Sequence, residues 1–413
     1  MNSSLISNSR YNIHVVNKMI VIFLFILYPV VALPFICSEI IRGRRYAFTL
    51  LALFIAWLGF LYPPTGDLYR YHLDFEYYKV LDYPHLLETL KGGMDILQPI
   101  SFWALSKIGF NANATRFLYV YIATELIFSI CYDFIKKYSF SKKQIVILLL
   151  LVILYIRFER LTVRFGLSTS LFIFGWYSCL YKNKNRFMPV ILSILNHFAF
   201  IVPLIAFLGS LVCKYRFRRW LILALILVSF TLSGDYLSAL INMLPFDDSV
   251  INHLLVYTDG YWAGAFYEDH SAKFKLGNML MRLPFFVLSF VFYKWYSQDK
   301  LSISILFMLI VVVVSSPFES LRMRMEQVYV WQLIVFCMVH SKQWIFNKRF
   351  VHRALAIGMI YLFLSTWTIR RQLSISHESK ILYPSWVIYH SGYDNNWVNV
   401  NVYEDGAPAN ISF

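Results

Sequence analysis

The sequence has little charge, few cysteines and none of the common nucleotide- or metal-binding motifs, and each shortage argues against a class of protein. Of its 413 residues, 15% are charged and 59% are hydrophobic, whereas a soluble domain has about 25% charged residues. The five cysteines lie in apolar runs or at their ends, so we expect no disulfide framework and no cysteine-based metal site. The chain has no Gly-rich phosphate loop, Walker sequence, His-Glu-x-x-His or Asp-x-Asp motif, which argues against ATP or nucleotide-sugar chemistry.

Repeated apolar runs dominate the chain instead. They are about 15–22 residues long and continuous, which predicts membrane-spanning helices rather than the alternating strands of a barrel. The predicted fold class is therefore all-α, a polytopic integral membrane protein forming a single transmembrane domain over residues 1–413, with about 12 transmembrane helices. We expect spans at residues 19–37, 46–62, 114–135, 144–157, 166–181, 187–197, 199–213, 219–234, 280–297, 301–316, 327–341 and 354–369.

The distribution of charge predicts the orientation of these spans. Lys and Arg cluster in short stretches, at 42–45, 136–143, 182–186, 214–219 and 342–353. This is the pattern of cytoplasmic loops, and it explains the net charge of +15 better than a nucleic-acid partner does. The large outer loops are then 64–113 and 235–280, together with 157–165, 317–326 and the tail 370–413.

Two further segments, 187–213 and 95–110, have sequence patterns that predict a particular structure. One helix over 187–213 would place the basic stretch 214–219 outside, so a hairpin of two short spans fits the charge rule better. Residues 95–110 have apolar residues at helical spacing and few charges, which suggests an amphipathic helix lying in the outer interface.

Polar and aromatic residues crowd together directly after the second span. If residues 67–78 form a helix, one face carries the residues at positions i, i+4, i+7 and i+11, namely Asp67, Tyr71, Asp74 and Tyr78. Carboxylates beside aromatic rings suit the hydroxyls and faces of sugars, and Asp67 could serve as a base. The alternatives are that Asp67 only caps the helix, or that the loop simply folds over the spans.

Three arginines follow the fourth span at positions that share one helix face, Arg157, Arg160 and Arg164. A row of guanidinium groups at a membrane surface suits phosphate or pyrophosphate. The alternative is contact with lipid headgroups, with Glu159 as a local partner.

Two further groups of polar residues lie in apolar surroundings. His197 interrupts an apolar stretch, where it is either a hydrogen-bonded core residue or a general base. The late span is preceded by Glu319, Arg322, Arg324 and Glu326. Arg322 and Glu326 are spaced for an internal ion pair, which leaves Arg324 pointing elsewhere on the helix.

At these four positions the chain resembles the EpsG/Wzy-type polysaccharide polymerases of bacterial inner membranes. The resemblance is carried by Gly-Asp-x-x-x-Tyr at 66–71, Arg-x-Gly-Leu-x-x-Ser at 164–170, His-Phe at 197–198 and Arg-x-Arg-x-Glu-x-x-Tyr at 322–329. Through topology and the order of these motifs it covers most of the chain. One departure is Ala199, which stands where the family often has a small hydroxyl residue.

The resemblance implies a glycosyltransferase that joins undecaprenyl-diphosphate-linked oligosaccharides on the periplasmic side of the inner membrane, with no metal and no cofactor. The expected base is His197 or Asp67. The expected diphosphate-binding residues are Arg157, Arg160, Arg164, Arg322 and Arg324, and the expected sugar-binding residues are Tyr69, Arg70, Tyr71, Asp74, Tyr78, Glu319 and Glu326. Expected partners are the two lipid-linked substrates and membrane lipids, with a chain-length regulator and a flippase as further candidates.

Two other functions compete with a polymerase. A flippase for the same lipid-linked unit has a similar number of spans, but we would expect it to have two similar halves and short outer loops. A glycan ligase or another transferase that uses a lipid-linked donor would carry much the same residues.

Overall fold

The computed structural model describes residues 2–91, 93, 95–155, 164–182, 186–230, 243, 282–340, 356, 358–364, 366–367, 370–404 and 406–409. Within these ranges the chain is helical and has no strand, apart from one isolated bridge between Val402 and Pro408. The all-α fold class is therefore confirmed.

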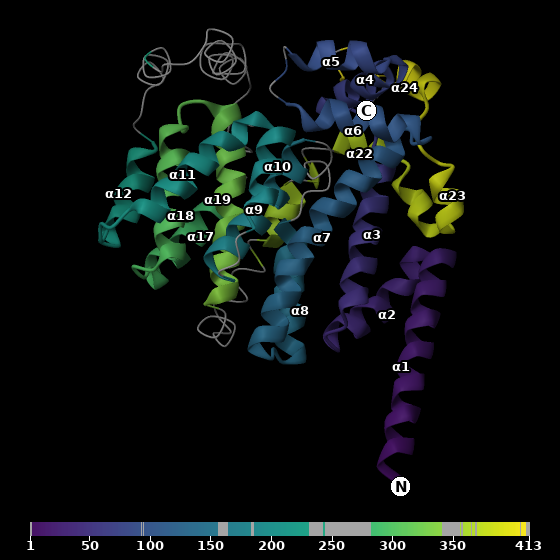
Figure 1. Ribbon diagram of the computed structural model, residues 1–413, viewed down its shortest axis with the longest axis horizontal. Helices are drawn as coiled ribbons and strands as arrows, with labels where there is room; N and C mark the ends of the chain where they lie inside the picture. Colours follow the sequence, from purple (N-terminus) through teal and green to yellow (C-terminus); the bar gives the residue numbers. More distant parts are fainter. Residues whose placement is uncertain are drawn as a thin grey trace.

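The helices are arranged as shown in Figure 1. Their bounds are α1 Asn2–Leu27, α2 Pro29–Ile41, α3 Arg45–Leu61, α4 Asp67–Val80, α5 Tyr83–Lys91, α6 Leu97–Lys107, α7 Ala112–Tyr138, α8 Lys142–Tyr155, α9 Phe165–Leu180, α10 Met188–Asn196, η1 Phe198–Phe200, α11 Ile201–Val212, α12 Trp220–Val228, α17 Leu283–Trp295, α18 Lys300–Val314, α19 Glu319–Val339, α22 Arg370–Ser374, η2 Glu378–Leu382, α23 Ser385–Tyr389 and α24 Asn395–Asn401.

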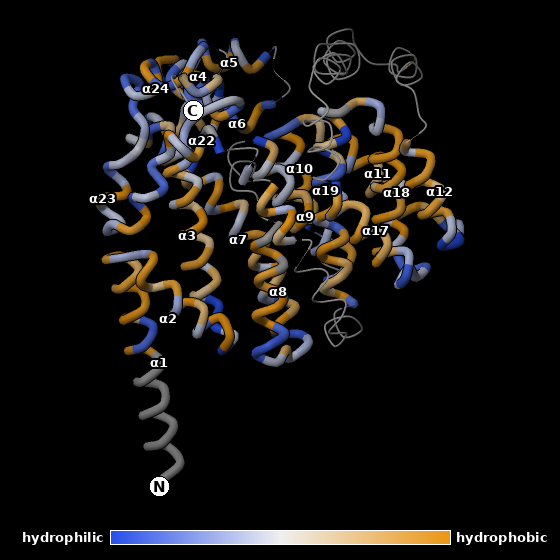
Figure 2. Tube along the Cα trace, turned by 180° about the vertical axis from the view of Figure 1, so that it is seen from behind, coloured by the Kyte–Doolittle hydropathy of each residue, from blue (hydrophilic) through white to orange (hydrophobic). Residues whose placement is uncertain are grey.

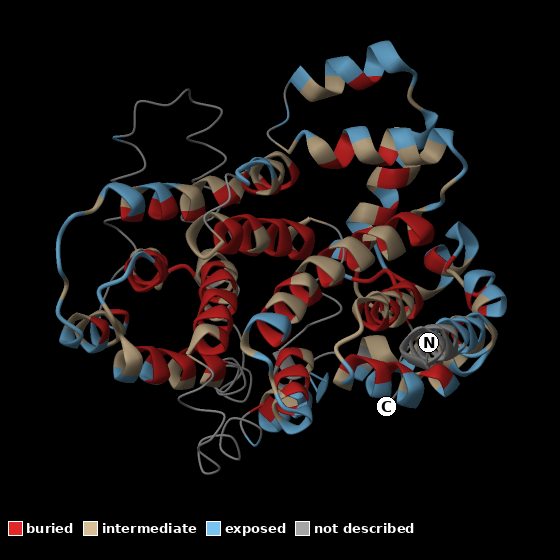
Figure 3. Ribbon diagram, turned by 60° about the horizontal axis from the view of Figure 1, so that its bottom comes forward, coloured by how far each residue is buried: buried red, intermediate tan, exposed pale blue. Residues whose placement is uncertain are grey.

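Helices α3 and α7 pack side by side along most of their length and form the frame of one half of the molecule. They run antiparallel, since Arg116 near the start of α7 reaches Phe60 near the end of α3, and Arg45 at the start of α3 pairs with Glu125 farther along α7. Helix α9 packs on α7, and α10 packs on α9. Buried residues form long runs on the central helices, while the peripheral helices are mixed (Figure 3).

The first expected span, 19–37, is wrong as a single helix. The chain is helical on both sides of Tyr28, but Tyr28 itself is extended, with φ −146° and ψ 96°. Pro29 at the first position of α2 explains the break, because a proline disfavours helical backbone at the residue before it. Helix α2, which has 13 residues, is about 20 Å long, shorter than the roughly 30 Å hydrocarbon core of a bilayer.

The stretch 187–213 has the break that the charge rule favours. Helix α10 ends at Asn196, His197 is extended with φ −152° and ψ 105°, and η1 leads into α11. The chain reverses direction here, because the ring of Phe187, just before α10, stacks on Phe207 of α11 at 6.0 Å.

The expected outer loop 317–326 is mostly helical, as the spacing of Arg322 and Glu326 indicates, and its position outside the membrane stays a prediction. Helix α19 begins at Glu319, so most of this segment forms the first turns of a helix that continues to Val339. Helices α17 and α18 pack against α19, and α11 packs on α18. The expected outer loop 235–280 lies outside the described residues apart from Met243.

One end of the α3–α7 pair, which we call the α4 end, carries the helical segment α4–α6 and the C-terminal residues (Figure 1). Residues 67–78 belong to α4 and residues 95–110 contain α6, so both segments are helical as the sequence predicts, while the interfacial position expected for 95–110 stays a prediction. The C-terminal residues are fastened here: the Tyr393 hydroxyl donates to the Leu61 carbonyl (2.5 Å), and His72 bonds Asn395 (2.7 Å).

Hydrophobic residues occupy the middle of the helices, and hydrophilic residues gather at their ends (Figure 2). Among the described residues one helix, Ala112–Tyr138, is both long and apolar enough to cross a membrane. The other apolar helices have 10–17 residues, Val15–Leu27, Pro29–Ile41, Arg45–Leu61, Phe165–Leu180, Phe198–Val212, Leu283–Trp295 and Lys300–Val314. The number of crossings, about 12, stays a prediction.

Candidate functional site

A cavity of about 270 Å³ lies at the α4 end, between α4 and the start of α9. Its lining residues are Asp67, Arg70, Tyr71, Leu73, Asp74 and Arg164. Two of the sequence motifs, which are far apart in the chain, therefore supply one cavity.

Helix α4 turns its polar face to this cavity because its other face is buried. Leu68, His72 and Phe75 are buried, and Leu68 and Phe75 join an apolar cluster with residues of α6, α7 and α9. Of the four residues predicted to share one face, Asp67, Tyr71 and Asp74 line the cavity, whereas Tyr78 does not.

The start of α4 depends on a glycine. Gly66 is the residue before the helix and has φ +57°, a conformation that side chains rarely adopt. Asp67 is the first helical residue, and no side chain caps the helix. The capping role considered for Asp67 is therefore wrong, and its carboxylate lies 3.9 Å from the Arg70 guanidinium at an exposed position.

Arg164 is held by contacts on more than one side. Its Nε donates to the Tyr71 hydroxyl at 3.1 Å, and its guanidinium lies 5.1 Å from the centre of the Tyr71 ring. One of its terminal nitrogens forms an ion pair with Asp95. This charged group is therefore fixed at the cavity wall rather than extended into solvent.

The break at His197 lies next to this arginine. The Asn196 amide donates to the Arg164 carbonyl at 2.8 Å and to the Ser168 hydroxyl at 2.9 Å. The ring of Phe165, which follows Arg164, lies 5.9 Å from the His197 ring and 6.0 Å from the Arg324 guanidinium. All four motifs of the family resemblance therefore meet around Arg164 and Phe165.

Burial changes the acidity of the groups in the cavity. It raises the pKa of the Asp74 carboxyl above its ordinary value of 3.8, against the lowering influence of Arg164, Arg70 and a hydrogen bond from Gln98. Burial also raises the pKa of the Tyr71 hydroxyl, while Arg164 lowers it and Asp67 raises it further. Asp74 is thus a better proton acceptor than an exposed carboxylate, and Tyr71 stays protonated at neutral pH.

Other predicted site residues lie elsewhere. Tyr69 packs with Trp397 against the cluster formed by Tyr393, Val398 and Val402. Tyr69 therefore contacts C-terminal residues and does not line the cavity, so its position does not support the expected sugar contact. Tyr78 packs beside the apolar cluster of α4, 6.4 Å from the Phe102 ring.

The acidic and basic residues of α19 divide into two groups. Glu326 forms a buried ion pair with Arg282 at 2.6 Å and lies 3.6 Å from Arg322. The expected sugar-binding role of Glu326 therefore has no support from its surroundings, whereas Arg324 lies against the Phe165 ring, next to Arg164. Glu319 begins the helix, but its side chain, like Arg157 and Arg160, lies outside the described residues.

Sequence reasoning missed several residues that build this end of the molecule. Asp95 was one of six carboxylates in the stretch 64–113, and nothing in the sequence distinguished it.

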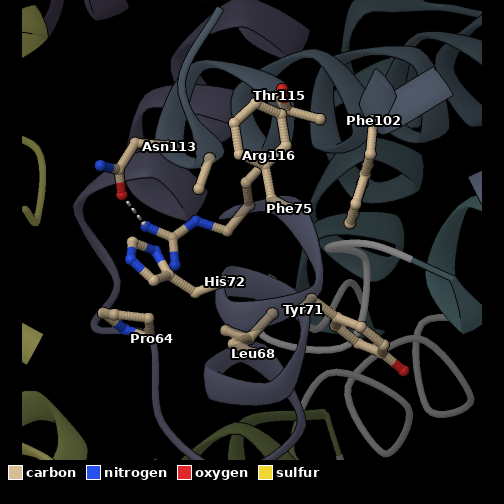
Figure 4. Close-up of a pocket in the computed structure, with 10 residues that line it drawn as sticks. Pro64, Leu68, Tyr71, His72, Phe75, Phe102, Asn113, Thr115 and Arg116 are labelled. Carbon is tan, nitrogen blue, oxygen red and sulfur yellow. Dashed lines mark hydrogen bonds between the residues drawn. The ribbon is translucent and has the colours of Figure 1, made fainter. Parts of the chain in front are cut away.

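A small cavity of about 20 Å³ behind α4 is bordered by Arg116 (Figure 4). The Arg116 guanidinium donates to the Phe60 carbonyl (2.7 Å) and the Asn113 side chain (3.2 Å), which ties α7 to α3. In the sequence, the only sign that Arg116 has a structural role is its position inside an apolar run.

In the part of the chain that the structure describes, no three His, Cys, Asp or Glu side chains gather as they would around a metal ion. Comparison with known proteins gave no match to a family model, a curated protein or a solved structure.

Proposed function

We propose that the chain is a membrane-embedded polysaccharide polymerase that joins undecaprenyl-diphosphate-linked oligosaccharides. The observation that carries the proposal is that four polar motifs, separated in sequence, meet around Arg164 and Phe165, and that two of them line one cavity. Carboxylates, a tyrosine and arginines stand together there, and a transfer from a lipid diphosphate to a sugar hydroxyl needs these groups.

A bilayer location and the side of the cavity are supported by charge and hydropathy. The apolar middles of the helices in Figure 2 would face lipid tails. The basic stretches 42–45 and 136–143 lie at the end of the α3–α7 pair opposite the α4 end, as the antiparallel contacts require. By the positive-inside rule the α4 end then faces the periplasm. The helices too short to span alone would pack within the bundle, as broken helices in membranes do.

In the proposed reaction, a hydroxyl oxygen of the acceptor sugar attacks the anomeric carbon of the donor. The bond between this carbon and the diphosphate oxygen breaks, and undecaprenyl diphosphate leaves with the electron pair. Arg164 and Arg324 would stabilise the charge that grows on the diphosphate. The acceptor proton would pass to a base, with Asp67 or His197 as the candidates from the sequence and Asp74 as a third from its raised pKa.

The test is a surface-glycan gel from the host bacterium. The gene is deleted and then restored as wild type or as Asp67→Asn, Asp74→Asn, Arg164→Ala, His197→Ala or Arg324→Ala at matched membrane levels. Glu88→Gln and Lys91→Ala serve as controls, because both residues are exposed in the same outer segment. We expect deletion to collapse the long ladder to one repeat unit, the controls to restore it, and Arg164→Ala to fail.

Other outcomes of this experiment identify the competing functions. Loss of all surface sugar, with lipid-linked units trapped on the cytoplasmic leaflet, would mean a flippase. Full-length polymer left on its carrier lipid would mean a ligase. Either result would overturn the proposal.

A further inference from the structure

Asp95 connects three separate parts of the site through one carboxylate. One oxygen pairs with the Arg164 guanidinium, and the other accepts the backbone N–H of Phe198 at 2.7 Å. The two partners lie 69 and 103 residues away in the sequence. Asp95 itself stands just before α6, in the segment that covers the helix ends.

The contact with Phe198 fixes the helix break. A break leaves backbone N–H groups without the usual helical partners, and a buried N–H needs an acceptor. Asp95 supplies this acceptor directly after His197, the residue at which the chain leaves α10. The resulting backbone directs the His197 ring toward Phe165 and Phe200, at 5.9 and 6.2 Å.

The contact with Arg164 fixes the guanidinium. Together with the Tyr71 hydroxyl, Asp95 holds the group from two directions. The side chain of Asp95 is 15% exposed and that of Arg164 is 31% exposed, so the pair is only partly screened by water. The negative charge of Asp95 also offsets part of the positive charge that Arg164 presents to an anion.

We infer that Asp95 is a positioning residue, which sets Arg164 and the His197 turn in the geometry for transfer and weakens ground-state binding of the diphosphate. The inference rests on the proposed function. It gives a signature that a merely structural residue would lack, because removing the charge strengthens anion binding while it slows turnover.

The experiment uses the purified full-length protein in lipid nanodiscs, with turnover of lipid-linked repeat units and binding of inorganic pyrophosphate measured in parallel. For Asp95→Asn we expect kcat to fall about 10- to 100-fold, as for a small displacement of reacting groups. We expect pyrophosphate to bind at least about threefold more tightly at low ionic strength. For Asp95→Glu, which keeps the charge but lengthens the side chain, we expect the slower turnover with pyrophosphate affinity unchanged.

The control is Glu88→Gln, which removes one charge from an exposed position of the same outer segment and should match wild type in both assays. Wild-type turnover in Asp95→Asn would overturn the inference and leave the proposed function standing. Slower turnover together with weaker pyrophosphate binding would also overturn it, since that result indicates a structural role only. A wild-type protein that does not polymerise in this assay would instead overturn the proposed function.

Discussion

Replacing Gly406 with alanine tests how the C-terminal residues hold the start of α4. Gly406 has φ +83°, and its carbonyl accepts the N–H of Gly66 at 2.8 Å. A Cβ added at Gly406 would lie 3.0 Å from the nitrogen and the oxygen of Gly66 and 3.1 Å from its Cα. These are backbone atoms just before Asp67, so they can move away only by disturbing the start of the helix.

The free-energy cost of Gly406→Ala has two parts, and the same substitution at Gly43 measures one of them. Gly43 has a similar φ of +71°, but a Cβ there meets nothing within 4 Å. Gly43→Ala should therefore cost only the left-handed backbone conformation, about 1–2 kcal/mol. Gly406→Ala adds the overlap with Gly66, about 1–3 kcal/mol for overpacking, for a sum of about 2–5 kcal/mol.

Hydrogen exchange of the Gly66 amide measures this cost where it acts. Its N–H is protected by the bond to Gly406, so a loss of about 2–5 kcal/mol should lower protection by a factor of about 30 or more. Gly43→Ala should leave the peptide covering Gly66 unchanged, because Gly43 lies between α2 and α3 at the opposite end. Equal protection in wild type and Gly406→Ala would refute the argument, as would an equal loss in both variants.

Three further predictions concern other contacts. Tyr71→Phe keeps the ring that lies 5.1 Å from Arg164 but removes the hydroxyl that accepts a hydrogen bond from the Arg164 Nε at 3.1 Å. A lost hydrogen bond to a charged group costs about 1.5–3 kcal/mol. A turnover assay should therefore show chain elongation at least about tenfold slower than in wild type. Glu326→Gln removes the carboxylate between Arg282 and Arg322. Unfolding experiments should show a loss of stability of about 3–5 kcal/mol, because two largely buried arginines lose this carboxylate. The exposed Glu88→Gln should cost about 0.5 kcal/mol or less in the same experiments. Burial lowers the pKa of His72 and of His377 below the ordinary 6.5, so the unfolded chain takes up more protons than the folded one below about pH 6.5, and stability falls there. Thermal unfolding at several pH values should show this decline, and His72→Gln should flatten it.

Much of the helical architecture could be predicted because it depends on local pattern. The apolar runs predicted the helices, and helical spacing predicted the polar face of α4, of which Asp67, Tyr71 and Asp74 line the cavity and Tyr78 does not. The break at Tyr28 was missed because Pro29 lies inside an apolar run, where hydropathy hides its effect on the preceding residue. The expected span 327–341 begins later than α19, which starts at Glu319, although the i, i+4 spacing of Arg322 and Glu326 already indicates a helix there.

The site was predictable only as separate clusters. Which of them meet is decided by contacts between distant residues, such as His72 with Asn395, 323 residues apart. Local patterns give no information about such pairs, so the sequence could not single out Asp95, and it could not show that Tyr69 packs on the C-terminal residues. In the same way, the spacing of Arg322 and Glu326 predicted their contact, but not the approach of Arg282, the residue just before α17.

The proposed polymerase and a flippase lead to different expectations for the surroundings of the cavity. A flippase must carry a polar headgroup through the bilayer, so its charged groups should continue inward from the cavity as a polar path. Here Tyr71 of the cavity wall packs directly against a buried apolar cluster that includes Phe75, Tyr119, Leu167 and Leu171. On this side of the cavity the described residues of the cluster are apolar, whereas Asn196, Ser168 and Arg324 continue the polar surroundings on the side of Arg164 and Phe165. The proposed polymerase, whose two substrates both present their sugars at one membrane face, needs a polar cavity at that face, and we expect the α4 end (Figure 1), where this cavity lies, to be that face.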